Sequence, residues 1–380
     1  MRPFMFNPGP RLLAGPEQAE ALAEKLPPGP CLFVTDQDLV RLGLTDAYRD
    51  AIGATRELLV FDSVEADPSK DTLLAAAQAG RSAKVASVVG FGGGSPMDVA
   101  KLASYLLGSG DELDEIWGVG LAVNQRLPLA LVPTTAGTGS EATPISVITC
   151  EGGVKLAVNS APLIADWAVL DATLTTGLPK HVTAATGIDA IVHAVEAYTS
   201  ARLKNPISDA LAREALRLLS SNLLTAIEQP QNLEARSAML LGAHLAGLAF
   251  SNAPVAGVHA LAYPLGGLHH LPHGLTNALM LRHVLAHNLE SARDHYAQLA
   301  EILEPDCAAE GSQARAALMI ERLDELARNS GLKLRLRDHG ISFEEAPLLA
   351  KEAMKQTRLL VNNPCEISES DAQRLYEAAW

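Results

Sequence analysis

Residues 85–101 read VASVVGFGGGSPMDVAK, where a short apolar run leads through three consecutive glycines into a helical pattern. The sequence predicts a buried strand over 85–91, a tight turn, and then a helix. We expect Ser95 at the helix cap and Pro96 at the first helical position. Glycines let the backbone pass close to a ligand, and the free N–H groups of a helix start favour an anion.

A dinucleotide pyrophosphate is the natural ligand for such a turn. The run GGGSP is not a GxGxxG fingerprint, however, so a plain tight turn before a helix stays open as the alternative. Asp98 has an alternative of its own, as the acidic end of a capping box with Ser95.

A second loop of small residues follows the predicted strand LPLALV and reads PTTAGTGSEAT over 133–143. Its backbone and hydroxyl groups can donate hydrogen bonds to phosphate or ribose, although an ordinary strand-to-helix turn has the same composition. The earlier strand CLFVTD ends on Asp36, whose carboxylate could accept from ribose hydroxyls and repel a 2'-phosphate. The cofactor is therefore predicted to be NAD rather than NADP.

The texture of the chain changes near residue 180. Before it, apolar runs such as CLFVTD and ELLVFDSV alternate with helical patterns, which is typical of an α/β layer with a largely parallel sheet. After it, long Ala- and Leu-rich helical stretches follow without strand-like runs. We predict an α/β domain over 1–180 and an all-α domain over 181–380.

Two segments of the second half carry residue types that bind metals. Residues 185–199 read ATGIDAIVHAVEAYT, in which Asp189 and His193 are four apart and so share one face of a helix. Oxygen plus imidazole suits Fe(II) or Zn(II) better than Mg or Ca. A local salt bridge or a helix cap is the alternative for such a pair.

The second segment, 258–274, reads VHALAYPLGGLHHLPHG, and its His259 and His273 flank what we take for a Gly-rich break. Six of the eleven histidines lie between 259 and 287. His270, three residues before His273, could be a pocket group, whereas His283 and His287 are interpreted as a polar helix face. Neither 181–200 nor 251–281 contains Lys or Arg, so no like charge in these segments would weaken a cation site.

Composition limits the function classes. The chain has 380 residues, 48% hydrophobic and 19% charged, enough for two domains with substantial cores. A net charge of -14 without a basic cluster argues against nucleic acid and against an anionic membrane surface. The four scattered cysteines fit free thiols in a reducing compartment, and the N-terminus has no signal-peptide core, so we expect a cytoplasmic protein.

Together these residues resemble the iron-containing (group III) alcohol dehydrogenase family over essentially the whole length. The resemblance rests on GGGSPMDVAK, PTTAGTGSE, VLDATLTTGLPKHVTAATGIDAIVHAVEAYTS, FSN at 250–252 and HALAYPLGGLHHLPHG. It implies the dehydroquinate synthase-like fold, with an N-terminal NAD-binding α/β domain and a C-terminal helical metal-binding domain. It also implies a homo-oligomer, commonly a homodimer.

The resemblance further implies site residues. The metal ligands, for Fe(II) or alternatively Zn(II), would be Asp189, His193, His259 and His273. The cofactor site would be lined by Asp36, Gly93, Gly94, Ser95, Asp98, Thr134, Thr135, Thr138, Lys155 and Leu170.

One position departs from the family pattern. One turn after His259, where many members carry a second histidine, this chain has Tyr263. A tyrosine near its reference pKa of about 10 is a poor proton shuttle at neutral pH unless a cation lowers it. Tyr263 and His270 are the catalytic candidates, and Ile145, Phe250 and Tyr263 are expected to line the substrate pocket.

These features predict a metal-dependent oxidoreductase that moves a hydride between NAD(H) and a small neutral primary alcohol or aldehyde. The missing Lys and Arg argue against a phosphorylated or dicarboxylate substrate. A dehydroquinate synthase-type lyase, a maleylacetate-type reductase and a catalytically silent nucleotide-binding protein remain as alternatives.

Overall fold

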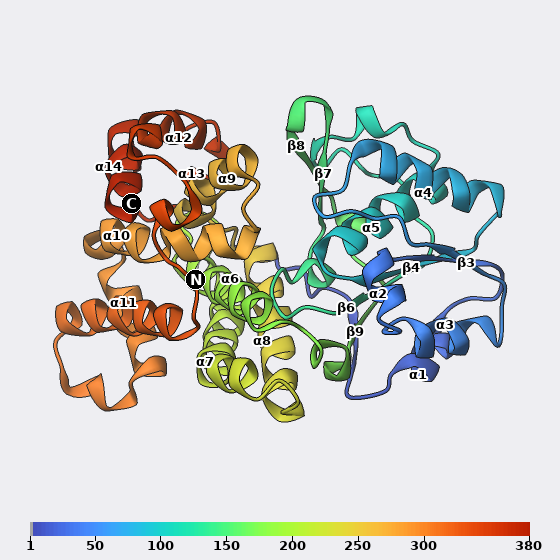
Figure 1. Ribbon diagram of the computed structural model, residues 1–380, viewed down its shortest axis with the longest axis horizontal. Helices are drawn as coiled ribbons and strands as arrows, with labels where there is room; N and C mark the ends of the chain where they lie inside the picture. Colours follow the sequence, from blue (N-terminus) through green and yellow to red (C-terminus); the bar gives the residue numbers. More distant parts are fainter. Residues whose placement is uncertain (1–2) are drawn as a thin grey trace. The chain divides into compact units, whose positions relative to one another are not determined.

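A computed structural model describes residues 3–380, and these fold into two compact units (Figure 1). One unit is Pro8–Thr176, and the other is Gly177–Trp380 together with the described residues 3–7. Asn7 is held within this second unit by hydrogen bonds between its backbone and the Asn252 side chain. The assignment of NAD binding to residues 1–180 and of metal binding to residues 181–380 stays a proposal.

The first unit is built on a six-stranded parallel sheet with the order β1-β9-β6-β4-β2-β3. From β2 the chain moves outward to β3, then returns to the other side of β2 and continues through β4, β6 and β9. The winding direction therefore reverses between β2 and β4, which makes the carboxyl ends of these two strands the place where such sheets bind ligands. The strands are β1 (Arg11–Ala14), β2 (Cys31–Val34), β3 (Leu58–Phe61), β4 (Ser87–Gly92), β6 (Leu129–Pro133) and β9 (Trp167–Leu170).

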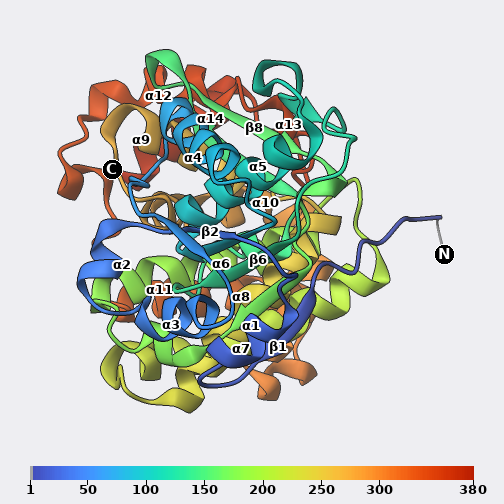
Figure 2. The same cartoon turned by 90° about the vertical axis from the view of Figure 1, so that its right-hand side faces the viewer.

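Alternate residues of the central strands pack into two separate hydrophobic cores, one on each face of the sheet. Phe33, Val89 and Val132 pack on one face with residues of α1 and α3, whereas Leu32 and Val88 pack on the other face with α4 and α5. Figures 1 and 2 show these two helical layers on opposite sides of the strands. The helices are α1 (Ala19–Lys25), α2 (Gln37–Arg41), α3 (Asp46–Gly53), α4 (Lys70–Ser82) and α5 (Gly94–Ser109).

The start of α5 differs from the expectation. Gly93 is the N-cap residue, Gly94 opens the helix, and no side chain caps it, so the placement of Ser95 at the cap and Pro96 at the first position was wrong. The difference costs no hydrogen bond, because the first four N–H groups of a helix have no intrahelical partner and Pro96 still lies among them.

A small second sheet was not predicted. Its order is β5-β8-β7, and β7 pairs with β8 in antiparallel fashion across the turn that contains Gly152 and Gly153. Both glycines have positive φ, which a tight connection requires. The strands are β5 (Gly118–Val119), β7 (Ile145–Thr149) and β8 (Lys155–Asn159).

The second unit is helical throughout Gly177–Trp380, as predicted, with short 3-10 turns between the α-helices. Its central element is α6, whose residues from Gly187 to Thr199 are all buried and which packs against α7, α8 and α10. The helices are α6 (Lys180–Thr199), α7 (Pro206–Glu228), α8 (Leu233–Asn252), α9 (Gly257–His269), α10 (His273–Leu303), α11 (Ser312–Asn329), α12 (Ala346–Ala353), α13 (Thr357–Leu360) and α14 (Glu369–Ala379).

The Gly-rich break expected between His259 and His273 does not exist at the glycines. Helix α9 continues through Gly266 and Gly267 and ends at His269, and the cap residue His270 adopts a left-handed conformation. Packing of the buried face of α9, including Leu261 and Leu265, outweighs the low helix propensity of glycine.

Within residues 3–380, no single helix combines the length and apolar composition of a membrane span. The helices α8 and α9 pass that test only as a pair, and they are bent by 106° relative to each other.

Candidate metal centre and nucleotide-binding edge

The helical unit brings together Asp189, His193, His259 and His273. One potential ligand atom from each residue lies within 4.8 Å of the others. The Nε2 atoms of His193, His259 and His273 lie 3.9, 3.9 and 3.8 Å from Asp189 Oδ1. One carboxylate and three imidazole nitrogens are the donor set of a transition-metal or zinc site.

Three helices supply these four side chains. Asp189 and His193 are one turn apart on α6, His259 lies in the first turn of α9, and His273 is the first residue of α10. Helices α6 and α10 approach closely at Gly274, where an added Cβ would lie 2.3 Å from the Ala185 carbonyl oxygen. The glycine after His273 is thus needed for the clustered side chains of the two helices to meet.

The cluster is buried on one side and open on the other. The side chains of Asp189, His193 and His259 are at most 6% exposed, whereas that of His273 is 38% exposed. Burial tends to raise the pKa of Asp189, but the imidazoles and a hydrogen bond from Asn277 outweigh it and hold that pKa below its ordinary value. The carboxylate therefore stays ionised at neutral pH, as a metal ligand must.

The amide of Asn277 lies inside the cluster. Its Nδ2 donates to Asp189 Oδ1 at 2.6 Å and lies 3.2 Å from His259 Nε2 and 3.3 Å from His273 Nε2. Its Oδ1 is buried and has no hydrogen-bond partner among the residues that the structure describes. A neutral amide N–H donor thus lies against three of the four donor residues, all of which present acceptor atoms toward it, and such an arrangement of acceptors fits a cation.

Glu196 supports His259 from behind. Its Oε2 lies 2.7 Å from His259 Nδ1 and accepts from Ala256 N, and its Oε1 accepts from Val258 N. The glutamate belongs to α6, seven residues after Asp189, and is buried.

Aromatic rings border the ligands. Phe250 stacks on the His193 ring at 4.5 Å between centroids, and the Tyr263 ring lies 5.7 Å from that of His273. The Arg358 guanidinium lies 6.0 Å from the Tyr263 ring. The sequence argument that no cation lies in the metal segments missed Arg358, because it comes from α13, far along the chain.

The other histidines of the segment lie elsewhere. His270 is exposed at the end of α9, and His269 pairs with Glu345 at 3.0 Å. His283 is partly buried, and this burial lowers its pKa, while His287 contacts the Glu366 carbonyl at 3.1 Å. The pocket role of His270 and the polar face of His283 and His287 stay predictions.

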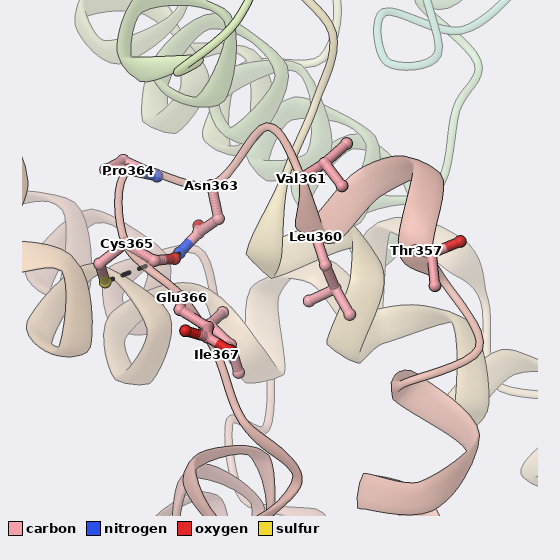
Figure 3. Close-up of a pocket in the computed structure, with 8 residues that line it drawn as sticks. All are labelled: Thr357, Leu360, Val361, Asn363, Pro364, Cys365, Glu366 and Ile367. Atoms are coloured by element: carbon pink, nitrogen blue, oxygen red, sulfur yellow. Dashed lines mark hydrogen bonds between the residues drawn. The ribbon is translucent and has the colours of Figure 1, made fainter.

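A separate surface pocket of the helical unit contains none of the four clustered residues. Its cavity volume is about 390 Å³, and Figure 3 shows the Asn363 amide beside Cys365 within it. It is lined by Thr357, Leu360, Val361, Asn363, Pro364, Cys365, Glu366 and Ile367.

In the α/β unit, the predicted cofactor residues gather at the carboxyl edge of adjacent strands. Asp36 follows β2, where its side chain caps α2 by accepting from Leu39 N at 2.9 Å. Gly93, Gly94 and Ser95 follow β4, the other strand of the reversal point. Burial is the largest cause of the raised pKa of Asp36.

The two small-residue loops are in contact. Thr134 N donates to the Gly92 carbonyl at 2.9 Å, and a Cβ added at Gly94 would lie 3.2 Å from Thr138 Cγ2. At Gly93 the nearest atom to an added Cβ is Thr135 Oγ1 at 3.8 Å, so protein packing does not require a glycine there. Gly93, Gly94, Ser95, Thr135 and Thr138 are all partly exposed.

Asp98 bonds to protein groups. Its carboxylate accepts from Ser140 Oγ at 2.6 Å and from Val147 N at 2.9 Å, and Lys101 Nζ lies 3.7 Å away. The capping box with Ser95 is therefore wrong, because Asp98 points toward β7 and the loop before it. Its cofactor role stays a prediction.

The remaining predicted residues are more dispersed. Lys155 on β8 forms an ion pair with Asp67 at 2.6 Å, and Leu170 ends β9 with its side chain buried. Ile145 opens β7, and its carbonyl accepts from Lys101 at 2.7 Å.

Sequence reasoning missed Glu196 and Asn277. Both had a signal, because Glu196 is three residues after His193 and Asn277 is four after His273, so each shares a helix face with a ligand. Their contacts with the clustered side chains are visible only in the folded chain, where the three helices meet.

Comparison with known proteins agrees with this architecture. Residues 9–172 match the iron-containing alcohol dehydrogenase family, and residues 183–380 match its C-terminal part. Long-chain-alcohol dehydrogenase 1 of Geobacillus thermodenitrificans is 39% identical over 92% of this chain and 89% of its own length. Sulfoacetaldehyde reductase of Bilophila wadsworthia is 34% identical over 91% of this chain and 90% of its own.

Solved structures show the same fold. A crystal structure of 1,3-propanediol oxidoreductase superposes with a TM-score of 0.95 at 33% identity, covering 100% of both chains. Sulfoacetaldehyde reductase from Bifidobacterium kashiwanohense, in complex with NAD+, gives 0.88 at 27% identity and covers 100% of this chain and 99% of its own. The chain belongs to the iron-containing alcohol dehydrogenase family, and it is an oxidoreductase.

Proposed function

We propose that this enzyme transfers a hydride between NAD(H) and a small neutral primary alcohol or aldehyde, with a divalent metal held by Asp189, His193, His259 and His273. The observation that carries the proposal is the convergence of these four side chains to within 4.8 Å around one point.

A bound Fe(II) or Zn(II) would supply Lewis-acid polarisation of the substrate oxygen. The protein contributes the rest: Asp189 provides a carboxylate oxygen, three imidazoles provide nitrogen donors, and the Phe250 ring covers the His193 ring by stacking. The partly exposed His273 and the neighbouring Tyr263 ring mark the side from which a substrate would reach the cluster.

The nucleotide would bind at the carboxyl edge of β2, β4 and β6. Gly93 supports this assignment. No protein atom lies closer than 3.8 Å to an added Cβ there, so protein packing does not explain the glycine, whereas close approach of a ligand to the backbone would. Asp36 next to the reversal point supports NAD over NADP through its negative charge. The proposed cofactor residues are Asp36, Gly93, Gly94, Ser95, Asp98, Thr134, Thr135, Thr138, Lys155 and Leu170.

The relatives carry different substrates in their names: long-chain alcohols, sulfoacetaldehyde, 1,3-propanediol and methanol. A neutral substrate is supported by the lack of Lys and Arg within the two metal segments. Arg358 is exposed and lies beside Tyr263, and its positive charge would favour an anionic aldehyde instead. Ile145, Phe250 and Tyr263 are the proposed substrate-pocket residues.

Metal analysis of anaerobically purified protein, coupled to NADH assays, tests the proposal. We expect one Fe(II) or Zn(II) per chain and turnover of propanal or butanal that a chelator abolishes and added metal restores. Sulfoacetaldehyde, assayed with wild type and Arg358→Ala, tests the neutral specificity, which strong preference for this anion would contradict.

The same assay separates the alternatives. Undiminished turnover in chelator would indicate a metal-independent, maleylacetate-type reductase. Product formation without net change of NADH would indicate a lyase, and no turnover on a broad panel with no bound metal would indicate a silent protein.

We also propose a cytoplasmic homo-oligomer. All four cysteines are free, which supports a reducing compartment. Light scattering after size-exclusion chromatography would reveal a monomer if the oligomer proposal is wrong.

A further inference from the structure

Glu196 is a buried acid with more donors around it than a helix cap requires. Its carboxylate accepts from Ala256 N at 2.9 Å and from Val258 N at 2.6 Å, at the start of α9. The third neighbour is the His259 ring, with Nδ1 2.7 Å from Oε2. Two backbone amides and one imidazole nitrogen thus converge on a single side chain that is 3% exposed.

This arrangement determines which nitrogen of His259 carries the proton. Both Glu196 oxygens already accept from backbone N–H groups, so the carboxylate acts as an acceptor here, and in the neutral ring Nδ1 is the donor while Nε2 presents its lone pair. Nε2 is the atom that faces Asp189 and the Asn277 amide, at 3.9 and 3.2 Å. The ring is therefore held in the tautomer that a metal ligand needs.

We propose that Glu196 is a positioning residue for the metal centre, which fixes the tautomer and direction of His259 while closing the N-terminus of α9. The inference rests on the proposed metal function. Helix α6 then carries two ligands and, one turn after His193, the residue that aims a third ligand from another helix.

Glutamine cannot replace Glu196 in this role. Its amide has the size of the carboxylate, but one end donates, so it would place an NH₂ group against an N–H of α9 or of the ring. The variant Glu196→Gln therefore changes hydrogen bonding at nearly constant volume.

A matched control comes from the same helix terminus. Gly257 N, between the two amides that Glu196 binds, donates to Asn363 Oδ1 at 3.3 Å. Asn363→Ala removes an acceptor from the start of α9 without removing the partner of the His259 ring. Because Asn363 also exchanges hydrogen bonds with Asn288 of α10, the variant reports what loosening of the α9 start and of its contact with α10 does while the Glu196 pairing stays intact.

The experiment measures Co(II) and Zn(II) affinity by competition with a chromophoric chelator. Loss of such a supporting hydrogen bond typically weakens metal binding about 10–100-fold, and we expect this for Glu196→Gln together with an altered Co(II) absorption spectrum. For Asn363→Ala we expect wild-type affinity and spectrum. Circular dichroism and thermal unfolding establish that each variant is folded.

A second measurement needs no Glu196 variant. Nitrogen-15 NMR of histidine-labelled, metal-free wild type reports the tautomer of His259, whose signal is assigned by its loss in His259→Gln. We expect protonated Nδ1 and unprotonated Nε2. Protonated Nε2 in the neutral ring would overturn the proposal even if Glu196→Gln does not fold.

The remaining outcomes are also decisive. Wild-type affinity in Glu196→Gln, or equal weakening in Asn363→Ala, would reduce Glu196 to a helix cap and overturn the inference. Wild type that binds neither ion would instead refute the proposed metal function, while the tautomer measurement would still report on Glu196.

Discussion

Each histidine of the candidate metal site has a specific neighbouring side chain. His193 is covered by the Phe250 ring, His259 is held by Glu196, and His273 lies beside Tyr263 at the exposed side. Tyr263 is the residue for which two interpretations compete, because its hydroxyl could move a proton and its ring could shape the pocket.

Tyr263→Phe separates these interpretations. We expect kcat to change by less than about threefold, because the ring contact with His273 would survive. Loss of a general acid–base group would instead lower kcat by about 10²–10⁴. Steady-state kinetics with propanal measures the change. A loss of two orders of magnitude would assign proton transfer to the hydroxyl, and Tyr263→Leu serves to show what the ring contributes.

At the scale of elements, close approach of helices and a buried ion pair hold the two sites in shape. Helix α10 can reach α6 only because position 274 has no side chain. In the α/β unit, the fully buried Lys101 ties α5 to the following loop and to β7 through Ser140 Oγ and the Ile145 carbonyl, each at 2.7 Å.

Gly274→Ala tests the helix contact. The new Cβ would lie 2.3 Å from a backbone oxygen that cannot move away alone, so we expect stability to fall by about 1–3 kcal/mol or more and metal affinity to fall with it. Thermal unfolding and metal titration measure both. Gly267→Ala is the control, because nothing lies within 4 Å of that added Cβ, and an equal loss there would contradict the argument.

Lys101 should make stability depend on pH. Burial lowers its pKa to about 8, against the attraction of Asp98 and Glu141. From that value up to its ordinary pKa of 10.5, the folded state binds fewer protons than the unfolded state, so the Lys101 contribution becomes more favourable as pH rises.

Chemical denaturation of wild type and Lys101→Met at pH 7 and pH 10 measures this effect. At pH 7 the variant should be less stable by about 3–5 kcal/mol, because Asp98 loses its buried partner. The gap should widen at pH 10. A gap that narrows would mean that the native pKa of Lys101 is not lowered.

At the scale of the whole molecule, the residues proposed for the two sites belong to two compact units. The proposed metal ligands all lie in Gly177–Trp380, and the proposed nucleotide residues all lie in Pro8–Thr176. Each unit has its own hydrophobic core, so damage to one site need not unfold the other.

His273→Ala tests this independence. Activity should fall at least about 100-fold, since a Lewis acid supplies several kcal/mol, while the dissociation constant of NAD stays within about twofold. Isothermal titration with NAD and metal analysis measure the two properties. Loss of NAD binding with activity retained would contradict both site assignments.

The sequence by itself determined the α/β layer and the helical half, because these depend on local spacing, whereas the full set of proposed site residues came from the family resemblance and stays a prediction. Apolar runs followed by glycines predicted strands and turns, and the i, i+4 spacing placed Asp189 and His193 on one helix face. It misplaced the cap of α5 and the end of α9, where packing outweighed propensity.

Only the tertiary structure decided which distant groups meet. Glu196 and Asn277 support the ligands, Arg358 lies beside Tyr263, and Asp98 turns toward β7, and each contact joins elements far apart along the chain. Side-chain spacing along one helix or strand is a local property that can be read from sequence. The convergence of three helices depends on the packing of whole surfaces, which no local pattern encodes.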